Sequence, residues 1–209
     1  MISKTLTWGQ KNTISRLVTS LSGNHLIVGT SDTVLGFLAP LTECGFLLLN
    51  KAKIRQEKPY IILVGNRVYL ESIIEIKSFQ IEKLISCWPA PLTLIFRAKD
   101  AVPVFMKSKN GTIAVRMPNH QGLLALLQQI PGLFSTSANK ASEPIPKSID
   151  ELDPDIVAAV DYLVVDEKES PAVVPSTILD CTGDQIRLVR EGAYSLRDLE
   201  HKTGISIVR

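Results

Sequence analysis

Short apolar segments, rich in β-branched and aromatic residues, recur along the whole chain and constrain its fold more than any other feature of the sequence. They lie at residues 25–28, 46–49, 60–64, 92–96, 112–115, 162–165, 176–179 and 186–189. Segments of this length and composition are typical of β-strands. Several are apolar at nearly every position, which is the pattern of strands that helices cover on both faces of a sheet. We therefore expect a helix-covered sheet.

Helical patterns lie between these segments. Apolar residues recur at helical spacing in two groups: Ile14, Leu17, Val18 and Leu21, and Leu123, Leu124, Leu126, Leu127 and Ile130. Ser148 with Glu151, and Ser195 with Asp198, have the spacing of helix caps and predict two further helix starts. Another helix is expected within residues 73–85.

The order of these elements mixes strand–helix units with adjacent strands. We therefore expect an α/β fold with a twisted mixed sheet flanked by helices, rather than a strictly doubly wound one. A chain of 209 residues is long enough for one substantial core. We see no internal repeat, low-complexity segment or linker, so residues 1–209 are predicted to form a single domain. The charged, proline-containing segment 167–175 is expected to be a long loop.

Composition excludes several classes of function. A formal net charge of +2 is too small to indicate a nucleic-acid-binding protein by itself. The three cysteines and three histidines are scattered, without CxxC or HExxH spacing, so we expect a reducing compartment and no protein-held metal. No apolar run approaches the length of a membrane span. The chain is therefore expected to be cytoplasmic, without membrane contact.

The common phosphate-binding motifs are missing from the sequence. Neither GxxxxGK[ST] nor GxGxxG occurs, and no GxSxG marks a serine hydrolase. A nucleotide would have to be held by separate side chains. Lys53, Arg55 and Lys58 lie directly before the apolar segment 60–64, where they could converge on a polyphosphate. A solvated basic face is the alternative interpretation of the same residues.

Two arginines and a hydroxyl pair lie at the ends of other apolar segments. Arg116 follows residues 112–115, and Arg190 follows residues 186–189. Each is either a surface residue at a strand end or a clamp for an anionic group, and the sequence leaves both open. Ser176 and Thr177 begin another predicted strand, where they form either a turn or part of a polar site.

The most polar short segment is residues 135–139, Ser-Thr-Ser-Ala-Asn, which directly follows an apolar pair. Hydroxyl and amide side chains compete for backbone hydrogen bonds and favour turns over regular structure. We therefore expect Ser135, Ser137 and Asn139 where a buried strand ends. There they would offer short donors and acceptors to a small polar substrate or a phosphate ester.

The order and spacing of these motifs resemble those of the YrdC-like family of threonylcarbamoyl-AMP synthases. The motifs are Lys53-x-Arg55 with Lys58-Pro59, Trp88-Pro89-Ala90-Pro91-Leu92-Thr93, Ala114-Val115-Arg116-x-Pro118-x-His120, Ser135-Thr136-Ser137-Ala138-Asn139, Pro175-Ser176-Thr177-Ile178 and Arg190-x-Gly192. The resemblance covers about residues 25–195, and the chain has the length of the family's short form.

The resemblance implies a twisted α/β fold with a central basic cavity. It also implies the condensation of L-threonine, bicarbonate or carbon dioxide, and ATP into threonylcarbamoyl-AMP and pyrophosphate, for threonylcarbamoyladenosine modification of tRNA. ATP is then a substrate, with Mg²⁺ bound through its phosphates. Downstream threonylcarbamoyl-transfer proteins are the implied partners, and tRNA contact is a further one. Catalysis would come from positioning and charge stabilisation, without a covalent intermediate.

Site roles carried over by position divide the residues into two groups. The implied ATP-binding residues are Lys53, Arg55, Lys58, Ser137, Asn139 and Arg190, of which Lys53 and Arg55 are the implied catalytic residues. The implied threonine-binding residues are Ser31, Arg116, Ser135 and Ser176. No metal ligand is implied.

Departures from the family pattern cluster at the amino-acid end of the site. The family usually has Pro-Thr-Asp/Glu-Thr-x-Tyr-Gly where residues 30–36 read Thr-Ser-Asp-Thr-Val-Leu-Gly, so Ser31 keeps a hydroxyl while the proline and the aromatic residue are lost. An RNA-binding paralogue without synthase activity is the alternative function, and a carbamoyl-handling relative of hydrogenase maturation proteins is a third.

Overall fold

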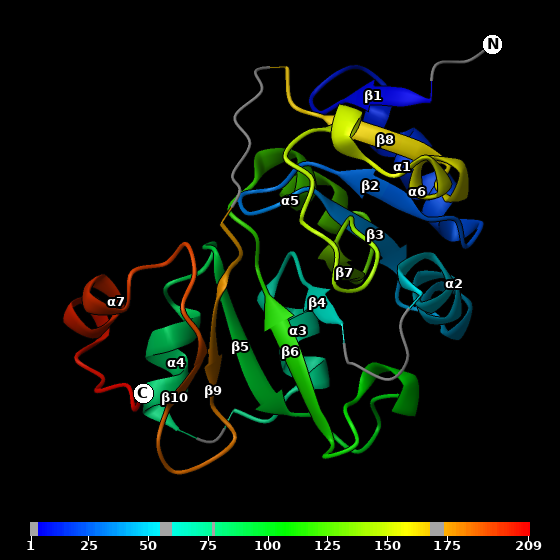
Figure 1. Cartoon of the computed structure of the whole chain (residues 1–209). Coiled ribbons are helices and arrows are strands. Elements are labelled where there is room, and N and C mark those ends of the chain that lie inside the picture. Colours follow the sequence, from blue (N-terminus) through cyan, green and yellow to red (C-terminus); the bar gives the residue numbers. More distant parts are fainter. Residues whose placement is uncertain (1–3, 55–59, 77, 168–173) are drawn as a thin grey trace.

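The computed structural model describes residues 4–54, 60–76, 78–167 and 174–209. In this part of the chain a ten-stranded mixed sheet has the order β1-β8-β2-β3-β7-β4-β6-β5-β9-β10 (Figure 1). The strands are β1 (Thr5–Thr7), β2 (Ile27–Gly29), β3 (Gly36–Pro40), β4 (Ile61–Leu63), β5 (Leu92–Arg97), β6 (Thr112–Arg116), β7 (Leu133–Ser137), β8 (Tyr162–Val165), β9 (Thr177–Asp180) and β10 (Arg187–Arg190). Parallel pairs are β1–β8, β8–β2, β4–β6 and β5–β9.

The sheet is strongly twisted, as the sequence predicts. In Figure 1 strands β1, β8, β2 and β3 run across the direction of β6, β5 and β9. Strand β7 lies between the two groups and is antiparallel to both of its neighbours, β3 and β4. A right-handed twist of each strand accumulates across a sheet of this width. The twist brings the ends of strands from both halves together around β7.

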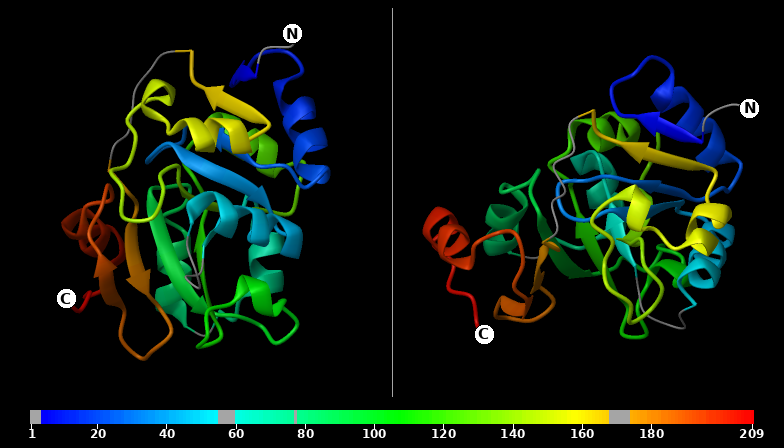
Figure 2. Two further views of the ribbon diagram at one scale, coloured as in Figure 1. Left: turned by 45° about the vertical axis from the view of Figure 1, so that its right-hand side comes forward. Right: turned by 45° about the horizontal axis from the view of Figure 1, so that its top comes forward.

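Helices cover both faces of the sheet (Figures 1 and 2). The α-helices are α1 (Thr13–Ser22), α2 (Glu43–Lys53), α3 (Arg67–Ile73), α4 (Phe79–Ile85), α5 (Gln121–Leu127), α6 (Pro154–Ala159) and α7 (Leu196–Thr203). Helices α1 and α5 pack around Leu38 in one apolar cluster. Phe37 and Ala39, which neighbour Leu38 in β3, belong to a second cluster that includes residues of α2 and α6. Successive residues of a strand point to opposite faces, so β3 is buried on both.

Most strand predictions are confirmed to within two residues, namely those for β2, β4, β5, β6, β8, β9 and β10. The prediction for residues 46–49 is wrong, because they lie inside α2. Gly45, Leu49 and Lys53 are the buried residues of that helix, at the four-residue spacing of one helical face. Thr42 begins the helix by accepting a hydrogen bond from the backbone N–H of Gly45.

Helix starts follow local capping chemistry more closely than apolar spacing. Ser195 caps α7 as predicted, accepting a hydrogen bond from the N–H of Asp198. Ser148 makes no side-chain cap and precedes only a short 3₁₀ turn, Ile149–Glu151, whereas Asp153 caps α6. The helix expected within residues 73–85 is α4, which begins only at Phe79 because Ser78 caps it, whereas Ile73 is the last residue of α3.

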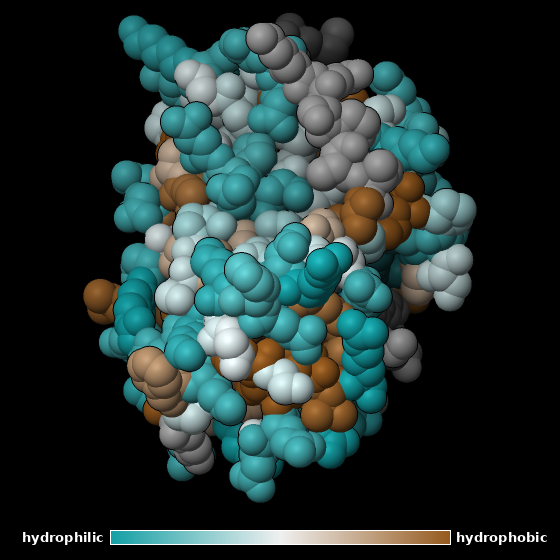
Figure 3. All heavy atoms as spheres, turned by 90° about the vertical axis from the view of Figure 1, so that its left-hand side faces the viewer, coloured by the Kyte–Doolittle hydropathy of each residue, from teal (hydrophilic) through white to brown (hydrophobic). Residues whose placement is uncertain are grey.

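The face over α4, α7 and β10 is largely hydrophilic, with hydrophobic atoms gathered in a few places (Figure 3). Val189 and Val208 are among the exposed large apolar side chains of the described residues. None of the described helices is both long enough and apolar enough to cross a bilayer.

Candidate active site

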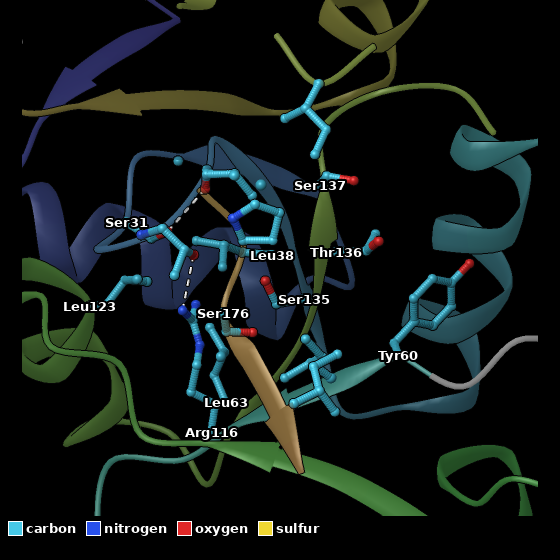
Figure 4. Close-up of a pocket in the computed structure, with 18 of the residues that line it drawn as sticks. Ser31, Leu38, Tyr60, Leu63, Arg116, Leu123, Ser135, Thr136, Ser137 and Ser176 are labelled. Atoms are coloured by element: carbon cyan, nitrogen blue, oxygen red, sulfur yellow. Dashed lines mark hydrogen bonds between the residues drawn. The ribbon is translucent and has the colours of Figure 1, made fainter. Parts of the chain in front are cut away.

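A cavity of about 270 Å³ lies over the middle of the sheet, where the twist brings strand ends together (Figure 4). Its polar lining comes from five places in the chain: the β2–β3 loop, the end of β6, the end of β10, the residues before β9, and β7. The polar lining side chains are Ser31, Thr33, Arg116, Ser135, Thr136, Ser137, Ser176 and Arg190. Six of the residues predicted from the sequence, Ser31, Arg116, Ser135, Ser137, Ser176 and Arg190, therefore converge on one cavity.

Strand β7 brings Ser135 and Ser137 to this cavity. Ser135 pairs with Leu38 of β3 on one side and with β4 on the other, while Ser137 pairs with Gly36. The expectation that the polar segment 135–139 begins where a strand ends is therefore wrong for its first three residues. Hydroxyls are tolerated within this strand because their side chains reach the cavity rather than the apolar core. A Cβ on Gly36 would lie 3.0 Å from the carbonyl oxygen of Thr136, so glycine permits the close approach of β3 to β7.

Arg116 is the buried cation of the site. Its residue is 4% exposed, and its guanidinium extends from the end of β6 toward the β2–β3 loop (Figure 4). Nη1 donates a hydrogen bond of 2.9 Å to Thr33 Oγ1 and lies 3.3 Å from Asp32 Oδ1. Nε is buried and has no hydrogen-bond partner among the described residues. An unpaired buried donor of a charged group costs free energy, which an anionic ligand would recover.

Arg190, which also lines the cavity, is held by hydrogen bonds to Ser176. Its Nη2 donates a 2.8 Å hydrogen bond to the carbonyl oxygen of Ser176, and Nε donates a second one of 3.2 Å. The hydroxyls of Ser176 and Thr93 are 2.8 Å apart. A Cβ on Gly192 would lie 2.6 Å from the Ser176 carbonyl oxygen, so a side chain there would push the two segments apart. The Arg190-x-Gly192 motif thus joins β10 to the residues before β9.

Lys53 lies beneath the polar segment, at the end of α2, and does not line the cavity. It is 3% exposed. Nζ donates hydrogen bonds of 2.9 Å to the carbonyl oxygen of Ser137 and 2.7 Å to Asn139 Oδ1. Ser137 Oγ also donates to Asn139 Oδ1, at 2.6 Å. Three of the six side chains predicted to bind ATP, Lys53, Ser137 and Asn139, thus form one hydrogen-bonded network, in which the lysine holds the end of β7.

The loop between β2 and β3 is ordered by its own hydroxyls. Ser31 Oγ donates to the carbonyl oxygen of Val34 and accepts from the backbone N–H of Thr33. Trp8 Nε1 donates to Thr30 Oγ1, which ties the loop to the residues after β1. Ser31 is thus a structural residue of the loop as well as part of the cavity wall. The segment that departs most from the family pattern is held by local hydrogen bonds.

The charged side chains among the described lining residues of the cavity are Arg116 and Arg190. Burial lowers the pKa of the Arg116 guanidinium, and nearby Arg190 lowers it further, while Asp32 acts in the opposite direction. Burial also lowers the pKa of Arg190. Both arginines would be stabilised in their charged form by anionic ligands. Arg55 and Lys58, the other predicted phosphate-binding residues, lie outside the described residues.

The sequence reasoning missed three residues of this site. Thr33 accepts a hydrogen bond from Arg116, Asp32 pairs with Arg116, and Thr93 contacts Ser176. Thr93 belongs to the Trp-Pro-x-Pro-Leu-Thr motif, so the motif itself could have indicated it. Asp32 and Thr33 lie beside Ser31, but their roles depend on the position of Arg116, 83 residues away from Thr33.

Known proteins resemble this chain in sequence over most of its length. Residues 19–192 match the Sua5_yciO_yrdC protein family, whose description reads "Telomere recombination". The threonylcarbamoyl-AMP synthase of Shigella flexneri is 29% identical over 185 residues, which cover 85% of this chain and 96% of that protein.

Solved structures show the same fold. The crystal structure of Pyrococcus abyssi Sua5 complexed with L-threonine matches with a TM-score of 0.87 and 28% identity over 99% of this chain. The match covers 62% of the Sua5 chain, so this chain spans less than two thirds of that protein. Escherichia coli YciO matches with a TM-score of 0.81 and 17% identity, over 93% of this chain and 97% of that protein, and supports the fold alone. The prediction of a twisted α/β fold is confirmed.

Proposed function

Since the chain belongs to the Sua5–YciO–YrdC family, we propose that it condenses L-threonine, bicarbonate and ATP into threonylcarbamoyl-AMP. We assign this function to residues 1–209 as a single domain. The observation that carries the proposal is a cavity that combines two arginines with serine and threonine hydroxyls and contains a buried, unpaired Nε donor on Arg116. The names of the relatives favour this activity, and no contact of the described residues favours the RNA-binding alternative.

The amino-acid subsite is formed by Arg116 and the hydroxyls around it. Arg116 receives the threonine carboxylate, because a guanidinium with a free Nε edge fits a carboxylate in a planar fork. Ser31, Ser135 and Ser176 line the same cavity and offer hydrogen bonds to the amino and hydroxyl groups of threonine. A site that hydrogen-bonds a substrate hydroxyl rejects analogues that lack it, since its own polar groups would then be left unpaired.

The nucleotide subsite lies toward Ser137, Asn139 and Arg190. Arg190 also lines the cavity and supplies positive charge to the phosphates. Arg55 and Lys58 are proposed to add further cations at this end. Lys53 supports the subsite by holding Ser137 and Asn139 through its two short hydrogen bonds. Its contribution to catalysis is then the placement of these groups.

The chemistry requires positioning rather than a protein nucleophile. The threonine nitrogen attacks the carbon of bicarbonate, and water leaves to give the carbamate. A carbamate oxygen then attacks the α-phosphorus of ATP. Pyrophosphate leaves as the bond between the α-phosphorus and the oxygen that bridges it to the β-phosphate breaks. Arg116 and Arg190 line one small cavity, where they hold the two anionic substrates and neutralise their mutual repulsion. Such orientation and charge stabilisation can supply a large part of the rate acceleration.

Mg²⁺ is proposed to enter with the nucleotide. The described residues contain no group of three or more histidine, cysteine, aspartate or glutamate side chains placed to hold a metal ion. The carboxylate beside the cavity, Asp32, is already paired with Arg116. These residues do not fit a protein-held metal, so we assign no step to one. Mg²⁺ prefers phosphate oxygens and water in such sites.

The product is a reactive mixed anhydride, so we propose that downstream proteins transfer its threonylcarbamoyl group to tRNA. We also propose a cytoplasmic location, where ATP, threonine and tRNA are all present. Direct contact between this chain and tRNA remains a further proposal.

Pyrophosphate release tests the proposed function. Purified protein with ATP, Mg²⁺ and bicarbonate should release pyrophosphate on addition of L-threonine, and much less with L-valine or L-serine. The matched control is the Arg116→Met variant, in which the carboxylate clamp is lost. Absence of threonine-dependent release would refute the proposal. Complementation of a strain lacking the cellular synthase, with tRNA nucleosides measured by mass spectrometry, tests the same activity in cells.

A further inference from the structure

Asp32 is a buried carboxylate that the substrate contacts described above leave without a role. Its side chain is 8% exposed. Oδ2 accepts a 2.8 Å hydrogen bond from the backbone N–H of Asn119, which anchors it to the segment after β6. Oδ1 lies 3.3 Å from Arg116 Nη1 and has no hydrogen-bond partner among the described residues. A carboxylate at this depth needs a partner of opposite charge, and Arg116 is that partner.

The ion pair fixes the direction of the Arg116 guanidinium. Asp32 and Thr33 both contact Nη1, so that end of the planar group is occupied by the β2–β3 loop. Nε, at the other end, has no partner among the described residues. Because the guanidinium is rigid and planar, fixing one end fixes the direction of the remaining donors. The loop therefore determines which edge of Arg116 is left for a ligand.

The charges around Arg116 make this support necessary. Burial lowers the pKa of its guanidinium, Arg190 lowers it too, and Asp32 raises it. Without Asp32, the two arginines would face one cavity that no carboxylate of the described residues lines, and their repulsion would not be offset there. A buried charge that loses its partner is strongly destabilised and moves or becomes solvated.

We propose that Asp32 is a positioning residue of the amino-acid subsite, which holds Arg116 so that its free edge receives the α-carboxylate of the substrate. Asp32 itself is not among the residues that line the cavity, so we assign it no contact with the substrate. This inference rests on the proposed function, since it takes an L-α-amino acid as the ligand. It predicts that the effect of Asp32 on binding depends on the α-carboxylate of that ligand.

A comparison of two ligands tests the role. Binding of L-threonine and of L-threoninamide, which lacks the carboxylate, is measured by calorimetry with a non-hydrolysable ATP analogue present. The variants are Asp32→Asn, Asp32→Glu and, as a matched control, Asp161→Asn, whose carboxylate bonds Ser20 away from the cavity. Asp32→Asn should reduce the preference for threonine over the amide by about ten-fold or more. Asp32→Glu should restore part of it, and Asp161→Asn should leave it unchanged.

Kinetics supply a second readout. Asp32→Asn should raise the KM for threonine while the KM for ATP stays within about two-fold, because the nucleotide subsite has other cations. Equal weakening of both ligands would show a general structural role and overturn the proposal, as would an unchanged preference for threonine.

Two further results separate the possible failures. If the unmodified protein binds no threonine, the proposed function itself is refuted. If Asp32→Asn does not fold, as judged by circular dichroism, Thr33→Val removes the hydroxyl that accepts the hydrogen bond of Arg116 Nη1, with little change in shape. A reduced threonine preference in that variant and in Asp32→Glu then supports the proposal, and an unchanged preference in both overturns it.

Discussion

Replacement of Lys53 by methionine separates two roles that the sequence alone cannot distinguish, phosphate contact and support of the site. The structure shows a lysine that is 3% exposed and donates hydrogen bonds of 2.7 and 2.9 Å to Asn139 and Ser137. Methionine keeps most of the apolar stem of the side chain but removes the charge and the donors. The two acceptors are then left without this partner at the end of β7.

The magnitude follows from these two bonds. A hydrogen bond to a charged group contributes about 1.5–3 kcal/mol, and the buried methionine recovers part of the loss through apolar contact. We therefore expect Lys53→Met to lower the free energy of unfolding by about 2–4 kcal/mol. For a domain of this size the melting temperature should fall by roughly 5–15 °C. ATP binding should weaken by at least about ten-fold, since Ser137 and Asn139 lose their anchor.

The assay combines thermal unfolding, followed by circular dichroism, with titration of an ATP analogue. Lys51→Met is the matched control, because Lys51 lies in the same last turn of α2 but is exposed. Its melting temperature should stay within about 2 °C of that of the unmodified protein. If Lys53→Met melts like this control and yet fails to bind ATP, the lysine acts on the phosphates directly and the positioning argument is wrong. If it melts early but binds ATP normally, the network is not part of the nucleotide subsite.

Three other substitutions or modifications test the remaining contacts. Arg116→Lys should raise the KM for threonine by about 10- to 100-fold with little effect on the KM for ATP, because lysine cannot form the planar fork with a carboxylate. Steady-state kinetics check this prediction. Equal effects on the KM for threonine and the KM for ATP would contradict it. Gly192→Ala should lower the free energy of unfolding in urea by about 1–3 kcal/mol and reduce pyrophosphate release. The reason is that the alanine Cβ would lie 2.2 Å from the carbonyl oxygen of Pro175. Normal stability and activity of the variant would argue against the close packing at the end of β10. Burial raises the pKa of the Cys181 thiol to about 12. At pH 8 an alkylating reagent should therefore modify Cys44 in the native protein and reach Cys181 only after unfolding. Peptide mass spectrometry checks this, and labelled Cys181 in peptides from the native protein would contradict it.

Local patterns predicted most of the fold. Apolar segments with strand composition gave the positions of β4, β5, β6 and β8, because such segments must be buried whatever their partners are. The prediction of a strand at residues 46–49 was wrong because it rested on the same apolar pattern. A short apolar run is compatible with either a strand or a buried helix face, and the cap at Thr42, together with contacts to β3, decides for α2.

The sequence by itself determined the family, the α/β class and the residue types that reach the cavity, since these follow from motif order and apolar pattern. Only the tertiary structure decided which contacts each of those residues makes. Lys53 was expected among the phosphate ligands, and its Nζ donates a hydrogen bond to the carbonyl oxygen of Ser137, 84 positions away. Asp32 and Thr33 gained roles through Arg116, which the twist of the sheet brings to their loop. Hydrogen bonds over such separations depend on sheet register and twist, and these are set by the packing of the whole chain rather than by any local segment.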